Sequence, residues 1–419
     1  MADTAAYAAG TEDRAIGARF ESLQDELASR GSTLEAHVRG RYAERWRSPA
    51  LAAALSIRTG LVLALHEFLA GRGLVNIDRV SISPVTDPLA HGVERVPVVE
   101  YKGVPYRTTH SMIYAKLLAC MNTGVRGVFV DSPNIRLELP DPSGAQRGKY
   151  LVDFSQMDVE FRRSLRIGEA MYREEPETVA CLLELERDRA LAFFEDMIVA
   201  ATSRLARRHG VELAALGVGL EPPVRPFPRF DRDEAIARHG ADGLEAALGA
   251  EAGTQFFWIT GLLRENYDLV YPCLDADGAP RPRASIRSRE VYNYDLCAAA
   301  RFADGSLGPA WEVLSGGLRE WLYPVIARRL VANGVLAEEP RFAPDGRLLN
   351  IAALGGYGPF LLAARLRGED GLPLFPETAG GGLGIERFLY ALLRGSAIRN
   401  IEDLTLFGKN PDSADIYLF

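Results

Sequence analysis

Hydrophobic and polar positions follow two different periods along this chain, and the changes of period predict its elements. Residues 1–47 are rich in Ala, Glu and Arg at helical spacing, which predicts a helical arm. Helical spacing continues from Leu51 to Gly71, whereas Val75 to Ser83 alternates like a strand and stops at Pro84. We therefore expect a first domain boundary near residue 47 and a second unit over residues 48–419.

The middle of the chain predicts a helical insertion, at about residues 165–250, between two stretches of sheet. Strand-like patterning precedes and follows it, and the last strand is rich in glycine. The predicted elements are, in order, sheet at 97–108 and 125–162 split by a helix at Ser111–Met121, helices at 169–209 and 233–248, strands from Gln255 onward, and a helix at Glu386–Arg394. Strands that flank helical segments without β-α-β alternation favour an α+β fold with a mostly antiparallel sheet.

Composition narrows the class of protein but does not identify a partner. The chain has 419 residues, 47% hydrophobic and 25% charged, which is typical of a globular protein with one large core. Four cysteines lie far apart without metal-ligand spacing, so we expect neither a disulfide framework nor structural zinc. No basic and apolar leader opens the chain, and the run Leu61–Leu65 is too short to span a bilayer, so we expect a cytoplasmic protein without a membrane span.

Two distant arginines close recognisable patterns. Arg136 lies in Asn134-Ile135-Arg136-Leu137-Glu138, and Arg387 ends Gly380-Gly381-Gly382-Leu383-Gly384-Ile385-Glu386-Arg387. These patterns resemble the second and third signature motifs of class II aminoacyl-tRNA synthetases, and the order helix, strand, proline near residue 84 resembles the dimer-forming first motif. Phosphate-binding loops of other nucleotide folds are absent from the sequence. The resemblance implies an ATP site and a homodimer formed through the first motif.

The resemblance gives several residues a role in catalysis and ATP binding. Arg136 is expected on the α-phosphate and Arg387 on the γ-phosphate, since a guanidinium binds phosphate oxygens through two parallel hydrogen bonds and stays charged. Glu138 is expected on the adenine amino group and Phe154 on its ring. The glycines at 380–382 and Gly384 are expected to let the backbone approach the nucleotide. Arg147 lies in a loop that is longer than usual for the family, and it is a further candidate for the triphosphate.

A second segment narrows the resemblance to the aspartyl/asparaginyl subgroup. It is Trp311-Glu312-Val313-Leu314-Ser315-Gly316-Gly317-Leu318-Arg319-Glu320, in which the resemblance implies that Glu312, with Ser315, holds Mg²⁺. Arg319, with Ser315 and Gly316 beside it, is expected to bind the side chain of the substrate. Asp295 is a third candidate metal ligand, although its separation from Glu312 exceeds the family norm. A surface ion pair is the alternative for Glu312 and Arg319.

Two further stretches favour aspartate over asparagine as the substrate. Ser111 and Lys116 align with a segment in which aspartyl enzymes keep a lysine on the substrate carboxylate. Gln156 and Asp158 lie in a stretch similar to the aspartyl version, around the substrate ammonium. A pocket with both Lys116 and Arg319 would favour an anion, because a neutral amide leaves buried charge poorly compensated. A helix-surface lysine is the alternative for Lys116.

The residues before Leu51 are patterned as helix and not as the anticodon-reading β-barrel of these synthetases. For this reason the chain resembles free-standing archaeal asparagine-synthetase-related proteins. We expect an AMP-forming ligase that activates L-aspartate, or a close analogue, with Mg-ATP and transfers it to ammonia or a small amine, and we do not expect tRNA as a partner. The alternatives are a truncated synthetase that charges a tRNA or carrier protein, and a non-catalytic nucleotide or amino-acid sensor.

Overall fold

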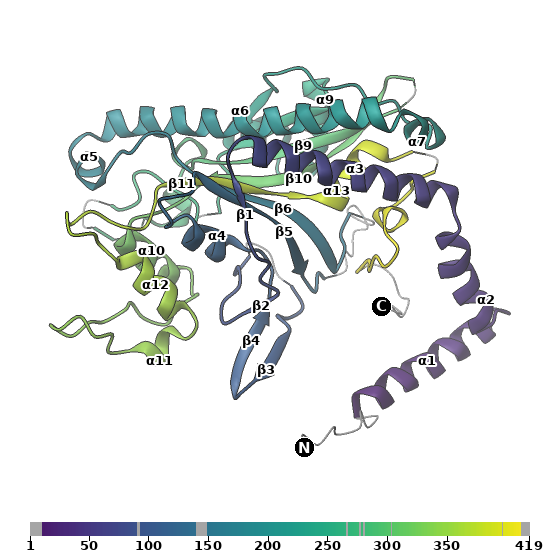
Figure 1. Ribbon diagram of the computed structural model, residues 1–419, viewed down its shortest axis with the longest axis horizontal. Coiled ribbons are helices and arrows are strands. Elements are labelled where there is room, and N and C mark those ends of the chain that lie inside the picture. The colour runs from purple at the N-terminus through teal and green to yellow at the C-terminus, as the bar shows by residue number, and fades with distance from the viewer. Residues whose placement is uncertain are drawn as a thin grey trace.

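The molecule is built around one large sheet, with long helices along one of its faces (Figure 1). The computed structural model describes residues 11–89, 93–139, 149–264, 267–275, 278–279, 281–302, 304–395 and 397–411. Eight strands form the large sheet in the order β1-β5-β6-β11-β10-β9-β8-β7. The two edge pairs are parallel and the five inner pairs are antiparallel. The predicted α+β class with a mostly antiparallel sheet is therefore confirmed.

The strands of the large sheet come from the whole length of the chain. They are β1 (Val75–Asn76), β5 (Gly127–Ile135), β6 (Asp153–Arg162), β7 (Arg229–Asp231), β8 (Phe256–Thr260), β9 (Asn293–Arg301), β10 (Leu307–Leu318) and β11 (Thr378–Gly384). The glycine-rich strand β11 lies in the centre, between β6 and β10. Residues near 156, 315 and 382 are thereby neighbours across three strands.

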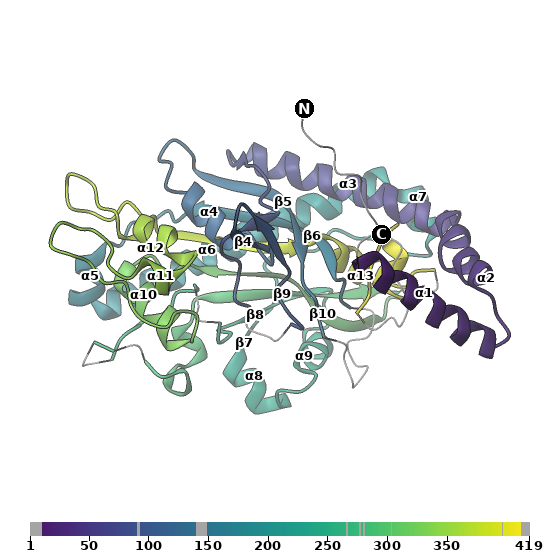
Figure 2. The same ribbon diagram turned by 90° about the horizontal axis from the view of Figure 1, so that it is seen from below.

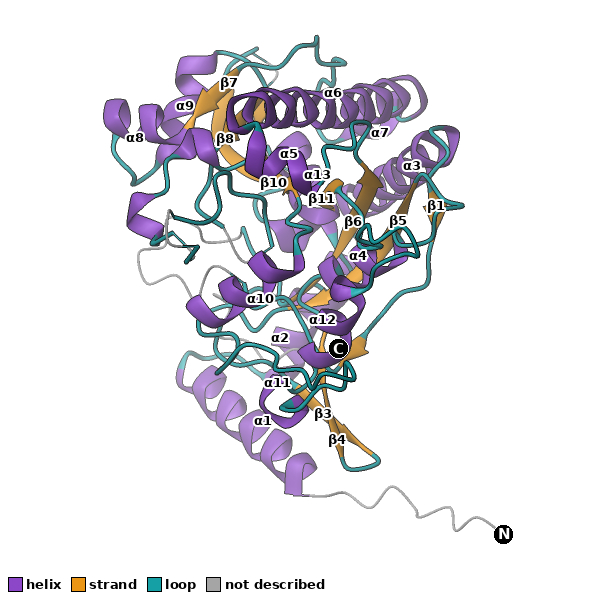
Figure 3. Cartoon of the chain, turned by 90° about the vertical axis from the view of Figure 1, so that its left-hand side faces the viewer, coloured by secondary structure: helices purple, strands orange, loops and turns teal. Residues whose placement is uncertain are grey.

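Alternation along the central strands gives the sheet two chemically different faces. On β6, Met157 and Val159 point to one face and are buried in the main core, whereas Gln156, Asp158 and Glu160 point to the other. The apolar face is covered by the helices α6 (Pro176–Arg208) and α13 (Ile385–Leu393), with α3 (Pro49–Gly71) beside α6, as Figure 3 shows from the side. The polar face is therefore the one that can hold a charged ligand.

Helix α3 joins the helical arm to the core. Its length and composition would suit a membrane span, but it packs along α6 and α13, and Leu61, Leu65 and Leu69 are fully buried, as expected for a core helix. The arm before it consists of α1 (Thr11–Ser29), α2 (Leu34–Val38) and the π-helical turn η1 (Arg39–Glu44). In Figure 1 the arm turns away from the sheet, and in Figure 2 it lies at the right-hand end of the molecule. The described part of the predicted arm, residues 11–47, is mostly helical, as the sequence predicts.

A three-stranded sheet of order β2-β4-β3 projects from the body below the polar face (Figure 1). It is formed by β2 (Ile82–Ser83), β3 (Val98–Tyr101) and β4 (Val104–Thr108). The single strand predicted from Val75 to Ser83 is wrong, because β1 and β2 belong to different sheets. Alternation continues through both short strands, so the pattern did not reveal the change of direction between them.

The remaining helices fill the segments between strands. They are α4 (Ile113–Ala119), α5 (Glu169–Glu174), α7 (Gly210–Ala215), α8 (Arg232–His239), α9 (Leu244–Ala252), α10 (Tyr323–Ala332), α11 (Ile351–Leu354), α12 (Tyr357–Arg365) and the short 3₁₀ turns η2 (Arg283–Ser285), η3 (Ser288–Glu290) and η4 (Ile401–Leu404). The helical insertion is thus several helices, with β7 within it. The sequence analysis predicted strands after Gln255 and did not expect the helices α10 to α12, which lie between β10 and β11.

Candidate active site

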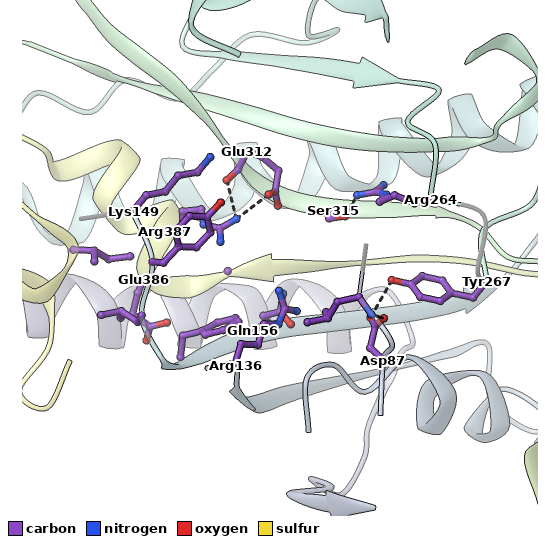
Figure 4. A pocket seen from close by; sticks show the side chains of 16 residues that line it. Asp87, Arg136, Lys149, Gln156, Arg264, Tyr267, Glu312, Ser315, Glu386 and Arg387 are labelled. Atoms are coloured by element: carbon purple, nitrogen blue, oxygen red, sulfur yellow. Dashed lines mark hydrogen bonds and ion pairs between the residues drawn. The ribbon is translucent and has the colours of Figure 1, made fainter. Parts of the chain in front are cut away.

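A cavity opens on the polar face of the large sheet, above β6, β11 and β10 (Figure 4). Its lining is strongly charged and comes from widely separated segments. The lining residues are Asp87, Leu89, Arg136, Lys149, Tyr150, Leu151, Phe154, Gln156, Arg264, Tyr267, Glu312, Ser315, Gly384, Glu386, Arg387 and Ile401. The cavity brings together seven residues that the sequence predicts for the site: Arg136, Phe154, Gln156, Glu312, Ser315, Gly384 and Arg387.

Arg136 is held at one wall of the cavity by a backbone carbonyl group and by an aromatic ring. Its Nε and Nη2 donate to the carbonyl oxygen of His110 at 3.0 and 2.8 Å. Its guanidinium carbon lies 5.1 Å from the centre of the Phe154 ring, in cation–π contact. A neutral carbonyl holds this arginine without neutralising it, so its positive charge remains effective toward an anion in the cavity.

Arg387 and Glu312 form the opposite wall. Arg387 Nη1 lies 2.8 Å from Glu312 Oε2, and its guanidinium carbon is 5.2 Å from the centre of the Tyr150 ring. Lys149 lies beside them and pairs with Glu245 of α9 at 3.2 Å, while Glu245 also accepts from the backbone nitrogen of Glu312. Burial acts to raise the pKa of Glu312, but Arg387 and Lys149 hold it below its usual value. Glu312 is therefore an ionised oxygen ligand facing the cavity.

Glu386 connects the cavity to the core helix α3. Its Oε1 accepts from Arg58 on α3 at 3.1 Å, and its Oε2 accepts from the backbone nitrogen of Ser155 at 2.9 Å. Burial raises the pKa of this carboxyl, and Arg58 opposes the shift. These two hydrogen bonds hold the start of α13 against β6 and α3, and they thereby position Arg387, the next residue of α13.

The glycines of β11 have different neighbours. A Cβ at Gly380 would lie 2.1 Å from Glu160 Oε2, and one at Gly382 would lie 2.9 Å from Asp158 Oδ1. The expectation that these glycines make room for the nucleotide is corrected here, because carboxylates of the chain itself take the space. At Gly384 the nearest atom is Arg387 Cβ at 3.6 Å, so only this position leaves space that belongs to the cavity.

Arg264 occupies the space between two of the predicted metal ligands. Its Nη1 pairs with Asp295 Oδ1 at 2.7 Å and donates to the hydroxyl of Ser315. Burial raises the pKa of Asp295 to about 7, although Arg264 opposes the shift. Among the described residues no group of three or more His, Cys, Asp or Glu side chains is placed to hold a metal ion. The donors fit a Mg²⁺ ion that arrives with a triphosphate and takes one carboxylate, Glu312, while Asp295 and Ser315 hold Arg264.

The inner end of the cavity is formed by Asp87 and Tyr267, whose hydroxyl donates to Asp87 Oδ2 at 3.0 Å. Lys116, Asp158 and Arg319 were expected around the substrate, but they lie behind this wall and are not part of the lining. Lys116 Nζ pairs with Asp158 Oδ1 at 2.7 Å, with both side chains almost fully buried. The alternative of a helix-surface lysine is therefore wrong, and so is that of a surface ion pair for Arg319.

Three further predicted residues, Ser111, Gly316 and Glu138, are described by the structure but are not part of the cavity lining. The Ser111 hydroxyl accepts from the backbone nitrogen of Ile113, at the start of α4. Gly316 contributes its carbonyl oxygen to Arg264 at 3.2 Å, and Glu138 forms an isolated β-bridge with Val93. Arg147 lies outside the described residues.

Several lining residues were missed by the sequence analysis: Asp87, Lys149, Tyr150, Arg264, Tyr267 and Glu386. Lys149 and Tyr150 could have been found, because they stand where these synthetases usually place an arginine and a histidine. Asp87, Arg264 and Tyr267 come from loops without a periodic pattern, and only the fold brings them beside β10.

No family model matches the sequence. The chain is similar to the aspartate–tRNA(Asp/Asn) ligase of Methanoculleus marisnigri, at 24% identity over 87% of this chain and 70% of that protein. It is also similar to the aspartate–tRNA(Asp) ligase of Pyrococcus furiosus, at 23% identity over 87% of this chain and 69% of that protein.

Solved structures give the same fold. The asparaginyl-tRNA synthetase of Entamoeba histolytica in complex with asparaginyl-adenylate matches with a TM-score of 0.61 and 16% identity, over 90% of this chain and 71% of that one. A putative aspartyl-tRNA synthetase from Leishmania major matches with a TM-score of 0.58 and 16% identity, over 91% of this chain and 70% of that one. The resemblance to class II synthetase catalytic cores is confirmed, whereas the expectation that tRNA is not a partner gains no support from these names.

Proposed function

Because the chain has the catalytic-core fold of the class II aminoacyl-tRNA synthetases and relatives among the aspartate–tRNA ligases, we propose that it is an ATP-dependent, AMP-forming ligase. It would activate the carboxylate of L-aspartate or a close analogue as an acyl-adenylate. The single observation that carries this proposal is the pair Arg136 and Arg387 on opposite walls of one cavity, each in cation–π contact with an aromatic ring, Phe154 for Arg136 and Tyr150 for Arg387. A sensor is the weaker alternative, since binding alone does not require both clamps.

The arginines supply what adenylate formation needs. An anionic carboxylate attacks an anionic α-phosphate, so positive charge must be present before the reaction and must follow the charge of the transition state. Arg136 suits the α-phosphate, and Arg387, with Lys149 nearby, suits the far end of the triphosphate. Glu312 would hold Mg²⁺, which screens the phosphate charge when it is bound. Arg387 would exchange its contact with Glu312 for one with phosphate.

Two acceptors compete for the second half of the reaction. One is ammonia or a small amine, as in an asparagine-synthetase-like ligase. The other is a tRNA or a carrier protein, and the names of the relatives favour tRNA. In both versions the amino acid would lie at the inner end of the cavity, beside Gln156 and Tyr267. We further propose a cytoplasmic homodimer through α3 and β1, where Leu63 and Val75 are exposed.

Exchange of labelled pyrophosphate into ATP tests the first half-reaction without assuming the acceptor. The chain is assayed with Mg-ATP and each amino acid of a panel, and we expect exchange that depends on one amino acid of the aspartate type. Absence of exchange with every amino acid, in a protein that binds ATP by calorimetry, would contradict the ligase and favour a sensor.

A second assay separates the acceptors. Product formation is followed by mass spectrometry with ammonia in RNA-free buffer, and in parallel with total tRNA under rising salt. Amide formation without RNA supports the asparagine-synthetase-like version. Acyl transfer to tRNA, with binding that weakens steeply as salt rises, supports the tRNA version.

A further inference from the structure

A buried cluster of charges, here called the network, lies at the inner wall of the cavity, and one of its members, Arg264, lines the cavity itself. It contains three cations and four carboxylates among the described residues. The cations are Lys116, Arg264 and Arg319, and the carboxylates are Asp158, Glu160, Asp268 and Asp295. The carboxylates outnumber the cations, so the cluster does not form the cationic pocket that an aspartate side chain would need.

Asp268 is the residue that changes the balance. Its Oδ1 accepts from Arg319 Nη1 at 2.5 Å, and its Oδ2 accepts from Asn293 Nδ2 at 2.8 Å. Arg264 Nε lies 3.6 Å from Oδ2. The side chain is held in register because Asp268 and Arg319 form a β-bridge and the flanking Leu269 donates to Leu318. Asp268 therefore occupies the guanidinium as a built-in carboxylate.

Two of the three guanidinium nitrogens of Arg319 already face carboxylates of the chain itself. Its Nε lies 3.4 Å from both carboxylate oxygens of Glu160, while Nη1 is taken by Asp268. The ring of Tyr267, which lines the cavity, is centred 5.5 Å from the guanidinium carbon. A ligand in the cavity thus meets Tyr267 first, and Arg319 lies behind it.

Two acceptors are left without a partner at this end, and the donor Arg264 Nε, also without a hydrogen bond, faces Asp268 Oδ2 at 3.6 Å. Asp158 Oδ2 and Gln156 Oε1 are buried and make no hydrogen bond among the described residues. Both side chains point to the same face of β6, and both lie close to Gly382. A buried acceptor without a donor is unfavourable, so this end is complementary to a group that brings N–H or O–H donors.

We propose that the side-chain subsite of this cavity accepts an amino acid whose side chain donates hydrogen bonds and carries no carboxylate, and that Asp268 is the residue that determines this preference. The neutral carboxamide of asparagine and the amine of 2,3-diaminopropionate belong to this class, whereas aspartate does not. The inference rests on the proposed amino-acid activation and specifies its substrate within the aspartate-like group.

The discrimination has a simple electrostatic origin. A substrate carboxylate would find Arg319 already engaged by Asp268 and Glu160, and it would add a further negative charge beside them. A carboxamide or amine can instead donate to Gln156, which lines the cavity and whose Oε1 has no partner among the described residues, without displacing any pair. A site that hydrogen-bonds one functional group rejects an analogue that lacks it strongly, so we expect kcat/KM to be lower for aspartate by about 100-fold or more.

The wild-type chain provides the first test. Pyrophosphate exchange is measured with Mg-ATP and, separately, asparagine, 2,3-diaminopropionate and aspartate. Exchange with asparagine or 2,3-diaminopropionate and little with aspartate supports the inference. Exchange with aspartate at an equal or higher rate overturns the inference but leaves the proposed ligase intact, whereas no exchange with any amino acid overturns both.

The variant Asp268→Asn supplies the second test, because it removes the charge and keeps the shape. We expect the ratio of kcat/KM for aspartate over asparagine to rise by about 10-fold or more. The matched control is Asp196→Asn, which removes an exposed carboxylate of α6 paired with Arg72 and should leave the ratio unchanged. An unchanged ratio in a folded Asp268→Asn protein contradicts the role of Asp268, and if that variant does not fold, the wild-type substrate panel decides.

Discussion

The two ends of the cavity hold their cations in opposite ways. At the nucleotide end, Arg136 is fixed by a neutral carbonyl and a phenyl ring, and Arg387 by a single carboxylate at the cavity surface. At the inner end, Lys116 and Arg319 are almost fully buried, and each lies against carboxylates of the chain itself. The first arrangement leaves charge for an incoming phosphate, whereas the second neutralises it and turns the same residue types into structural elements.

This difference follows from the cost of desolvation. A buried charge that lacks a partner is strongly unfavourable, so a cation at the centre of the sheet requires a carboxylate of its own. A cation at the edge of a cavity keeps contact with water until the ligand arrives. Function at the nucleotide end and stability at the inner end should therefore respond to different substitutions.

The largest effect is expected at the inner end. Lys116→Ala leaves Asp158 buried without its cation and should lower the free energy of unfolding by about 3–5 kcal/mol, as measured by urea denaturation. Arg72→Ala, which breaks an exposed pair with Asp196, is the control and should cost about 0–1 kcal/mol. Equal losses in the two variants would mean that burial does not separate these pairs.

At the nucleotide end, Arg387→Ala should lower pyrophosphate exchange by about 10²–10³-fold, because it removes a charge-stabilising donor from the transition state. Its melting temperature should change little by comparison with Lys116→Ala. Arg367→Ala removes an exposed partner of Glu169 and is the matched control, with exchange unchanged. Loss of folding in Arg387→Ala, with retained exchange per folded molecule, would reverse the assignment of the two ends.

Two glycines of the same strand sharpen the comparison. Gly380→Ala would place Cβ 2.1 Å from Glu160 Oε2, and we expect a loss of about 1–3 kcal/mol in the free energy of unfolding. Gly384→Ala meets no protein atom closer than 3.6 Å and should keep its stability within about 0.5 kcal/mol while weakening ATP binding. Denaturation and calorimetry on both variants check this, and a stable Gly380→Ala protein would contradict the packing argument.

The smallest effect is expected for the adenine platform. Phe154→Leu keeps an apolar side chain but removes the aromatic face, so the dissociation constant for ATP should rise about 5-fold, equivalent to about 1 kcal/mol. The control Phe342→Leu removes another ring stacked by an arginine, Arg365, away from the cavity. A dissociation constant that changes equally in both variants would argue against stacking on Phe154.

The nucleotide end could be predicted from sequence because its residues lie in short local patterns. Arg136 directly follows β5, and Phe154 lies at the start of β6, which pairs with β5. Gly384 is the last residue of β11, and Arg387 lies in the first turn of the helix that follows. Once these strands pair, residues at their ends lie close together, so a local sequence pattern is enough to predict them. The inner end was predicted less well, since the partners of Lys116 and Arg319 lie far away in sequence and Asp268 carries no motif.

The sequence by itself determined the α+β class, the helical arm, the glycine-rich strand and the cavity residues Arg136, Phe154, Glu312 and Arg387, because each depends on periodicity or on a contiguous motif. Tertiary structure alone decided that Val75–Asn76 and Ile82–Ser83 belong to different sheets, that Arg264 stands between Asp295 and Ser315, and that Asp268 neutralises Arg319. The last two of these facts concern which carboxylate pairs with which buried arginine. Ion pairs of this kind form between residues that are brought together only when the sheet closes, so no local pattern contains them.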